Sequence, residues 1–126
     1  MQSWLKSNIV NSTLYFGTDE GYSAEFSEQK RSIADKKTLR VCFDNSELKT
    51  ATKLRWDPIE GYASKINVIS VKTDGVFEKI VPINADEIFE TGEILFSTFD
   101  PQFRIKGNFS SATYLHIEYQ CEIIDW

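Results

Sequence analysis

Residues 114–123 alternate strictly between polar and apolar positions, and this pattern constrains the fold more than any other feature of the chain. The apolar positions are Leu115, Ile117, Tyr119, Cys121 and Ile123. Because successive side chains of a strand point to opposite sides, the segment is predicted to be a long strand with one buried face and one solvated face. Such strands are typical of antiparallel sheets.

Five further segments have the alternation or the β-branched and aromatic content expected of strands. They are residues 39–43, 66–71, 76–81, 94–99 and 103–105. The Gly-containing turn at Thr73-Asp74-Gly75 predicts that segments 66–71 and 76–81 form a hairpin. Only residues 24–37 have a helix-favouring composition, and a surface loop is the alternative there because few of their apolar residues share a helical face.

The chain of 126 residues has the length of one domain, so we treat residues 1–126 as a single unit. Hydrophobic residues (41%) and aromatic residues (13%) are too frequent for a disordered chain. Many short strands predict an all-β fold, an antiparallel β-sandwich of the jelly-roll or Greek-key type, with a barrel as the alternative. The predicted core contains Leu54, Trp56, Val41, Phe43, Leu115, Ile117, Tyr119 and Cys121.

The charge balance disfavours polyanionic partners. Nineteen acidic residues against 14 basic residues give a net charge of -5, which opposes binding to nucleic acid or to an anionic membrane and favours a neutral or cationic partner. No apolar run is long enough for a membrane span, and the first residues lack a secretory signal, so a cytoplasmic location is expected. Cys42 and Cys121 are accordingly expected to be free thiols.

Catalytic motifs are missing, so the domain is not expected to be an enzyme. The single histidine, His116, falls on the polar face of its predicted strand, and no phosphate-binding, zinc-binding or nucleophile-elbow motif occurs. Adjacent acids at Asp19-Glu20 and Asp86-Glu87 point apart on an extended backbone, which does not suit glycoside hydrolysis. No cofactor is predicted, although Asp19-Glu20-Gly21 leaves a structural calcium site open.

The segment Leu54-Arg55-Trp56-Asp57-Pro58 is the most distinctive local feature. Alternation buries Leu54 and Trp56 and places Arg55 and Asp57 together on the opposite side, where they can form an ion pair. Pro58 has no amide hydrogen for a sheet and forces the preceding residue into an extended conformation, so a strand is predicted to end at this point.

Three further motifs follow one another along the chain. They are Thr13-Leu14-Tyr15-Phe16 with Gly21-Tyr22-Ser23, then Leu54-Arg55-Trp56-Asp57-Pro58-Ile59-Glu60-Gly61, then Thr98-Phe99-Asp100-Pro101-Gln102-Phe103. In this order they resemble an accessory domain of bacterial glycosyltransferases, a family with an LYYD opening followed by a GF pair, an LRFDP centre and a DPQF stretch before the last strand. The chain has Trp56 where the family pattern has Phe, and it has Phe16-Gly17-Thr18 where the family pattern has an acidic residue. The resemblance implies a carbohydrate-binding-like β-sandwich that accompanies an enzyme of cell-surface polysaccharide synthesis.

Sugar binding requires an aromatic ring for the apolar side of a pyranose and polar groups for its hydroxyls. Tyr22 beside Asp19 and Tyr62 beside Glu60 are the candidate ligand-binding residues, and Tyr114 is a third candidate ring. The leading hypothesis is therefore a non-catalytic carbohydrate-binding or substrate-positioning module of a bacterial glycosyltransferase. The alternatives are a structural module, which packs on its parent catalytic domain or on itself, and a stand-alone glycoside hydrolase.

Overall fold

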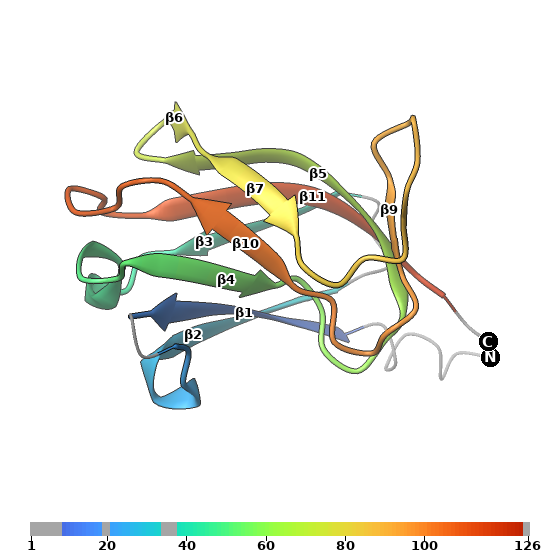
Figure 1. The fold of residues 1–126 in the computed structure, drawn as a ribbon, viewed down its shortest axis with the longest axis horizontal. Coiled ribbons are helices and arrows are strands. Elements are labelled where there is room, and N and C mark those ends of the chain that lie inside the picture. The colour runs from blue at the N-terminus through green and yellow to red at the C-terminus, as the bar shows by residue number, and fades with distance from the viewer. Residues whose placement is uncertain (1–8, 19–20, 34–37, 125–126) are drawn as a thin grey trace.

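The computed structural model describes residues 9–18, 21–33 and 38–124, which form two antiparallel sheets packed face to face (Figure 1). The first sheet has the order β2 (Ser27–Ile33), β1 (Ile9–Gly17), β4 (Lys53–Asp57), β10 (Phe103–Lys106) and β7 (Lys79–Pro82). The second sheet has the order β3 (Thr38–Phe43), β11 (Leu115–Ile123), β5 (Ser64–Thr73), β9 (Ile94–Phe96) and β8 (Glu87–Ile88), and β6 (Val76–Phe77) pairs with β5. The predicted all-β sandwich is thus confirmed.

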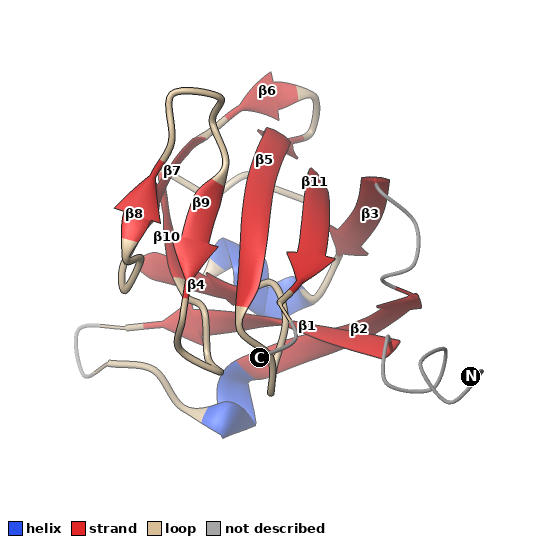
Figure 2. Ribbon diagram, turned by 90° about the vertical axis from the view of Figure 1, so that its right-hand side faces the viewer, coloured by secondary structure: helices blue, strands red, loops and turns tan. Residues whose placement is uncertain are grey.

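Two short 3-10 turns interrupt the strands: η1 (Ala24–Phe26) lies before β2, and η2 (Ser46–Lys49) lies between β3 and β4. In Figure 2, strands β9, β5, β11 and β3 stand side by side in one layer, and β1 and β2 run across beneath them in the other. The long strand β11 pairs with β3 on one side and with β5 on the other, so the strand that alternates most strictly lies inside its sheet.

The core fills the space between the two layers, and all eight residues predicted for it are buried. Trp56 is at its centre, with ring centroids 4.8 Å from Tyr119 and 5.4 Å from Phe103. The indole nitrogen of Trp56 donates a 2.7 Å hydrogen bond to the buried hydroxyl of Ser12. The hydroxyl of Tyr119 donates to the carbonyl oxygen of Pro58. Buried polar atoms of the aromatic core are therefore satisfied inside it.

The predicted hairpin of segments 66–71 and 76–81 is only partly present. Val76 and Phe77 pair with β5, but the chain then leaves the second sheet, and Lys79–Pro82 pairs with β10 in the first. Glu78 makes this crossing: its N–H donates to the carbonyl oxygen of Val71, and its carboxylate accepts from the hydroxyl of Thr73. The turn residues predicted that the chain reverses its direction. No local sequence pattern indicates that the chain then moves from the second sheet to the first.

The predicted helix or loop over residues 24–37 is wrong for most of that segment. Only the turn η1 is helical, and Ser27–Ile33 forms the edge strand β2, while residues 34–37 lie outside the described residues. An edge strand pairs on one side and often carries charged residues. Strand β2 fits that role, since it carries Glu28, Lys30 and Arg31. These charged residues interrupt the alternation of polar and apolar positions that would have indicated a strand.

The two cysteines are free thiols that point in different directions. Cys42 is exposed on β3, opposite His116 of β11, whereas Cys121 faces the core. Burial raises the pKa of the Cys121 thiol to about 12. The thiol of Cys121 therefore stays protonated at neutral pH.

Candidate functional site

The candidate site is the outer face of the first sheet, the face turned away from the core. Leu54, Trp56, Phe103 and Ile105 point inward, so the residues between them point outward. The register places Tyr15 beside Arg55 and Arg55 beside Arg104, and it places Thr13 beside Asp57. Three neighbouring strands therefore present polar, charged and aromatic groups on one surface.

Arg55 and Asp57 form the ion pair at the centre of this face. Arg55 donates from Nε to Oδ1 and from Nη2 to Oδ2 of Asp57, both at 3.0 Å. The residues are two apart on β4, so they project from the same side of the strand, as predicted from the sequence. Pro58 then ends the strand, as also predicted.

Asp57 is almost inaccessible to solvent, with 1% of its surface exposed. Next to it the loop after β4 turns back, and the N–H of Gly61 donates to the carbonyl oxygen of Phe99. Gly61 has a φ of 89°, a conformation that a residue without a Cβ adopts freely. Burial raises the pKa of Asp57 to about 7, because the desolvation of its charge outweighs the hydrogen bonds and the positive charge of Arg55. The nearby Asp100 raises that pKa further.

Two tyrosines surround Arg55. The guanidinium carbon of Arg55 lies 4.3 Å from the ring centroid of Tyr15 and 5.5 Å from that of Tyr22. The ammonium of Lys53 lies 4.8 Å from the Tyr22 centroid. Burial raises the pKa of both phenols, so both rings are neutral hydrogen-bonding groups at physiological pH.

Gly17 makes room for Tyr22. A Cβ at this position would lie 2.6 Å from Cε1 of Tyr22 and 2.7 Å from Cγ of Lys53. A glycine in a strand often marks such a close approach. The Tyr22 ring therefore lies directly against the backbone of β1 on the outer face.

Glu60 extends the polar network at the other end of this face. Its Oε1 accepts a 3.1 Å hydrogen bond from the hydroxyl of Thr13, and its Oε2 accepts a 3.4 Å hydrogen bond from Nε2 of Gln29. Gln29 also donates to the Thr13 hydroxyl. The Glu60 carboxylate is thus held over β1 and β2, next to the buried Asp57.

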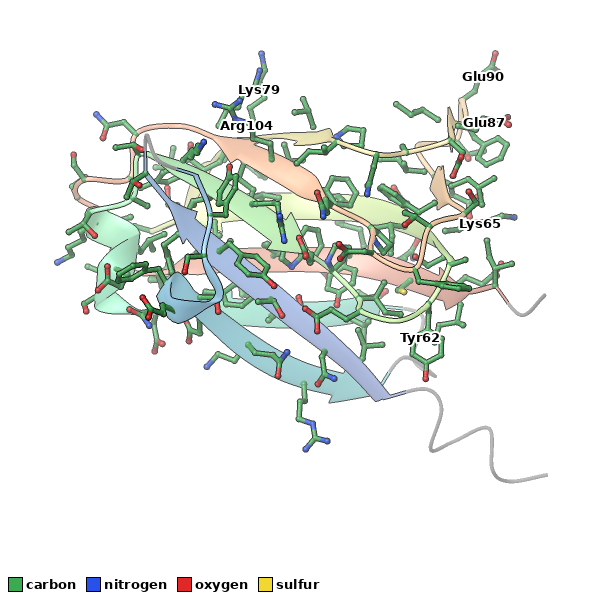
Figure 3. All side chains as sticks on the ribbon, turned by 60° about the horizontal axis from the view of Figure 1, so that its bottom comes forward. Tyr62, Lys65, Lys79, Glu87, Glu90 and Arg104 are labelled. Atoms are coloured by element: carbon green, nitrogen blue, oxygen red, sulfur yellow. The ribbon has the colours of Figure 1, made fainter. Side chains whose placement is uncertain are left out.

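The structure brings together some of the candidate residues and separates others. Tyr22 and Glu60 lie on the outer face, towards opposite ends of β1 and β4. Tyr62 packs against the hydrophobic core and, in Figure 3, lies far from the labelled outer-face residue Arg104. Tyr114 is 37% exposed and comes just before β11 in the second sheet. Asp19 lies outside the described residues.

The three segments that carry the family resemblance meet in space. Tyr15 is on β1, Arg55 and Asp57 are on the paired strand β4, and Asp100 precedes β10, which pairs with β4 on its other side. The negative charge of Asp100 raises the pKa of both Asp57 and Tyr15. The side-chain amide of Gln102 donates a 2.8 Å hydrogen bond to Asp100.

Sequence reasoning missed Tyr15 and Arg104 as members of this face. Tyr15 lies between the buried residues Leu14 and Phe16, and a strand prediction over residues 13–16 would have turned its ring outward. Arg104 alternates with Phe103 and Ile105 in a predicted strand, but only the pairing of β10 with β4 brings it to Arg55.

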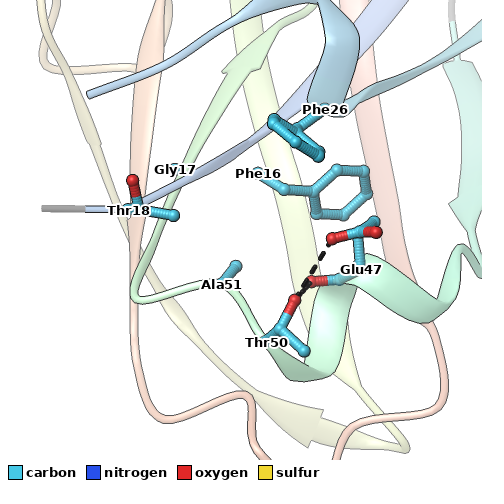
Figure 4. A pocket seen from close by; sticks show the side chains of 7 residues that line it. All are labelled: Phe16, Gly17, Thr18, Phe26, Glu47, Thr50 and Ala51. Atoms are coloured by element: carbon cyan, nitrogen blue, oxygen red, sulfur yellow. Dashed lines mark hydrogen bonds between the residues drawn. The ribbon is translucent and has the colours of Figure 1, made fainter. Parts of the chain in front are cut away.

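A separate pocket of about 250 Å³ lies at the edge of the sandwich (Figure 4). It is lined by Phe16, Gly17, Thr18, Phe26, Glu47, Thr50 and Ala51. The hydroxyl of Thr50 donates to the carbonyl oxygen and to the carboxylate of Glu47, so this polar pair is already engaged. The pocket is small and mainly apolar, and it holds no cluster of ionisable groups for chemistry.

Among the described residues no group of three or more His, Cys, Asp and Glu side chains is arranged to hold a metal ion. The Asp19-Glu20-Gly21 segment, where a calcium site was left open, falls largely outside those residues. Over the same part of the chain, no helix has the length and apolarity to span a bilayer. Comparison of the sequence and the fold with protein-family models, curated proteins and solved structures gave no match.

Proposed function

We propose that the domain is a non-catalytic carbohydrate-binding module and that the outer face of the first sheet holds the glycan. The observation that carries this proposal is the position of Tyr22, whose ring lies against Gly17 between the flanking cations Lys53 and Arg55. The ring is half-buried, so part of it remains open to a ligand.

The chemistry of the face suits a pyranose. The apolar C–H side of a sugar ring packs on an aromatic side chain, and its hydroxyls bind fixed donors and acceptors. Glu60 and Gln29 are held by hydrogen bonds to each other and to Thr13, so they need little ordering when a ligand arrives.

The carboxylates of the face favour binding over bond cleavage. Hydrolysis of a glycoside needs two acids that reach the same scissile bond from opposite sides. Asp57 is 1% exposed and paired with Arg55, so it does not reach a ligand on the surface. Glu60 is occupied by Thr13 and Gln29. A glycoside hydrolase would have to break both arrangements.

We place the module in the cytoplasm as part of a bacterial glycosyltransferase that builds a cell-surface polysaccharide, and there it would position the growing glycan. The motif resemblance supports this context. The three segments that carry the resemblance lie next to one another around Arg55 and Asp57. The parent catalytic domain is then the second partner of the module.

The test is a binding screen with fragments of bacterial cell-surface polysaccharides, using the Tyr22→Ala variant and Tyr114→Ala as its matched control. Both variants remove one partly exposed tyrosine ring. We expect Tyr22→Ala to abolish binding and Tyr114→Ala to retain it, and we expect the fragments to remain uncleaved in chromatography. Equal losses in the two variants, or cleaved fragments, would contradict the proposal.

A structural role is the second candidate, and the tip of the β5–β6 hairpin favours it. Val76 and Phe77 are 64% and 69% exposed, which is unusual for large apolar side chains at adjacent positions. Such a tip can pack on the parent catalytic domain or on a second copy. Light scattering of the wild type and of a Phe77→Ser variant tests self-association, and a monomer at all concentrations would exclude it.

A further inference from the structure

A row of basic side chains crosses the outer face beside Tyr22. The register pairs Gly17 with Lys53 and Lys106 with Lys79. Ile105 pairs with Leu54, so continuing that register by one residue places Lys106 next to Lys53. Lys53, Lys106 and Lys79 therefore form one row over three strands, which we call the lysine row.

Arg55 and Arg104 form the next row of the same face. They lie directly opposite each other on β4 and β10. Figure 3 shows the labelled side chains of Arg104 and Lys79 projecting from the same side of the molecule. Five of the 14 basic residues of an acidic chain are thus gathered on three adjacent strands.

Among the residues that the structure describes, most of these cations have no acidic partner. The ion pairs between described residues are Lys30–Glu28, Arg40–Glu118 and Arg55–Asp57. Within the described part of the chain, no carboxylate pairs with Lys53, Lys79, Lys106 or Arg104. Lys79, Lys106 and Arg104 are exposed, so they are accessible to a ligand.

The arrangement is unfavourable for folding alone. Like charges directly opposite each other on neighbouring strands destabilise a sheet. In the first sheet Lys106 has a like charge on both sides, Lys79 on β7 and Lys53 on β4, and Arg104 lies opposite Arg55, whose own charge is paired with Asp57. A bound anion between these strands would turn the repulsion into attraction, since each of its oxygens could accept from two cations.

We infer that the glycan is anionic and that its acidic group binds between the lysine row and Arg104. This inference rests on the proposed function, because Tyr22 lies beside Lys53 and supplies the stacking surface for the same ligand. It names the class of substrate: a polysaccharide with carboxylate or phosphate substituents. The net charge of -5 suggests a neutral or cationic partner, but the local charge of this face is positive.

The far end of the face distinguishes such a glycan from a nucleic acid. Glu60 lies there with its carboxylate over Thr13, and Asp100 lies close to Asp57. A backbone with a charge on every unit would meet these acids and be repelled. A glycan whose charges are spaced by neutral sugars can place an acidic unit on the lysine row and its hydroxyls against Glu60 and Gln29.

The experiment is isothermal titration of the protein with uronic-acid-containing and phosphate-containing fragments of bacterial polysaccharides. The carboxyl-reduced form of each uronic-acid fragment and the dephosphorylated form of each phosphate fragment serve as the neutral ligands. The charge-reversed variant carries Lys79→Glu and Lys106→Glu. Its matched control carries Lys65→Glu and Lys72→Glu, which make the same change of charge in the second sheet.

We expect acidic fragments to bind with dissociation constants of about 0.1–1 mM, as is usual for a shallow site. The neutral forms and the Lys79/Lys106 variant should each lose roughly three- to tenfold in affinity, and the Lys65/Lys72 control should not. Binding should also weaken when NaCl is raised from about 0.05 to 0.5 M, because salt screens exposed charges.

Two further outcomes separate the inference from the proposed function. Equal binding of the neutral and acidic fragments, lost in Tyr22→Ala, would overturn the anionic ligand and leave carbohydrate binding in place. Absence of binding by every fragment at millimolar concentration would overturn both. An oligonucleotide that binds more tightly than any acidic fragment would overturn the inference in favour of a nucleic acid.

Discussion

Arg55 donates two hydrogen bonds of 3.0 Å to Asp57, and this pair marks the boundary between the basic and acidic ends of the outer face. Lys53 and Lys106 lie towards one end of the face, and Glu60 lies towards the other. The pair is the only one of the described ion pairs in which a partner is almost fully buried. The contribution of this pair to the unfolding free energy therefore shows how strongly the centre of the face is stabilised.

The first prediction concerns Asp57 and pH. The pKa of Asp57 is about 7 in the folded state and near its ordinary value of 3.8 in the unfolded chain. Between these values the folded state binds more protons than the unfolded state, so stability falls as pH rises from about 4 to 7 and then levels off. Relative to Asp57→Asn, the wild type should lose about 2–4 kcal/mol of unfolding free energy over this window.

Urea unfolding of both proteins at intervals from pH 4 to pH 8 measures this difference. The Asn variant lacks the titrating group, so subtraction isolates Asp57 from the other carboxylates. If the wild type instead gained stability relative to Asp57→Asn as pH rises, Arg55 would outweigh burial and the account of this pair would be wrong.

The second prediction concerns the hydrogen bond between Trp56 and Ser12. Both side chains are fully buried, so Ser12→Ala leaves the indole N–H without a partner and should destabilise the fold by about 1–3 kcal/mol. In a Trp56→Phe background the donor is already gone, and the same change should have a much smaller effect. A double-mutant cycle by chemical denaturation measures the coupling; equal effects in both backgrounds would show that the bond contributes little.

The third prediction concerns Gly17. An alanine Cβ there would lie 2.6–2.8 Å from the ring of Tyr22, so the ring has to move. We expect Gly17→Ala to lower glycan affinity about as much as Tyr22→Ala does, and to change the unfolding free energy by less than about 1 kcal/mol, since glycine is itself less favourable than alanine inside a strand. In a Tyr22→Ala background Gly17→Ala should have only a small further effect, from the displacement of Lys53, whose Cγ would lie 2.7 Å from the new Cβ. A titration of all three variants with one fragment tests this, and an additive loss would mean that Gly17 acts on something other than the ring.

The sequence predicted those parts of the fold that depend on local alternation. Strand β11 was recognisable because Ile117 and Tyr119 face the core while Glu118 faces solvent. Strand β2 was not, because an edge strand with Lys30 and Arg31 lacks that contrast. The crossing at Glu78 was also missed, because a turn predicts a change of direction and not a change of sheet.

The candidate site was predictable only in pieces. The Arg55–Asp57 pair follows from two positions on one strand, and its prediction is confirmed. Arg104, Lys106 and Lys79 come from strands distant in the sequence, and their gathering depends on the register of β4, β10 and β7. Register is set by long-range packing, so no local pattern could indicate the lysine row.

Binding of a glycan to the outer face of the first sheet can be observed residue by residue, by amide NMR during titration with an acidic polysaccharide fragment. We expect saturable shifts that cluster on Gly17, Tyr22, Lys53, Arg55 and Arg104, with the second sheet unchanged. Shifts centred on Tyr114 or Phe77, or no shifts at millimolar ligand, would contradict it.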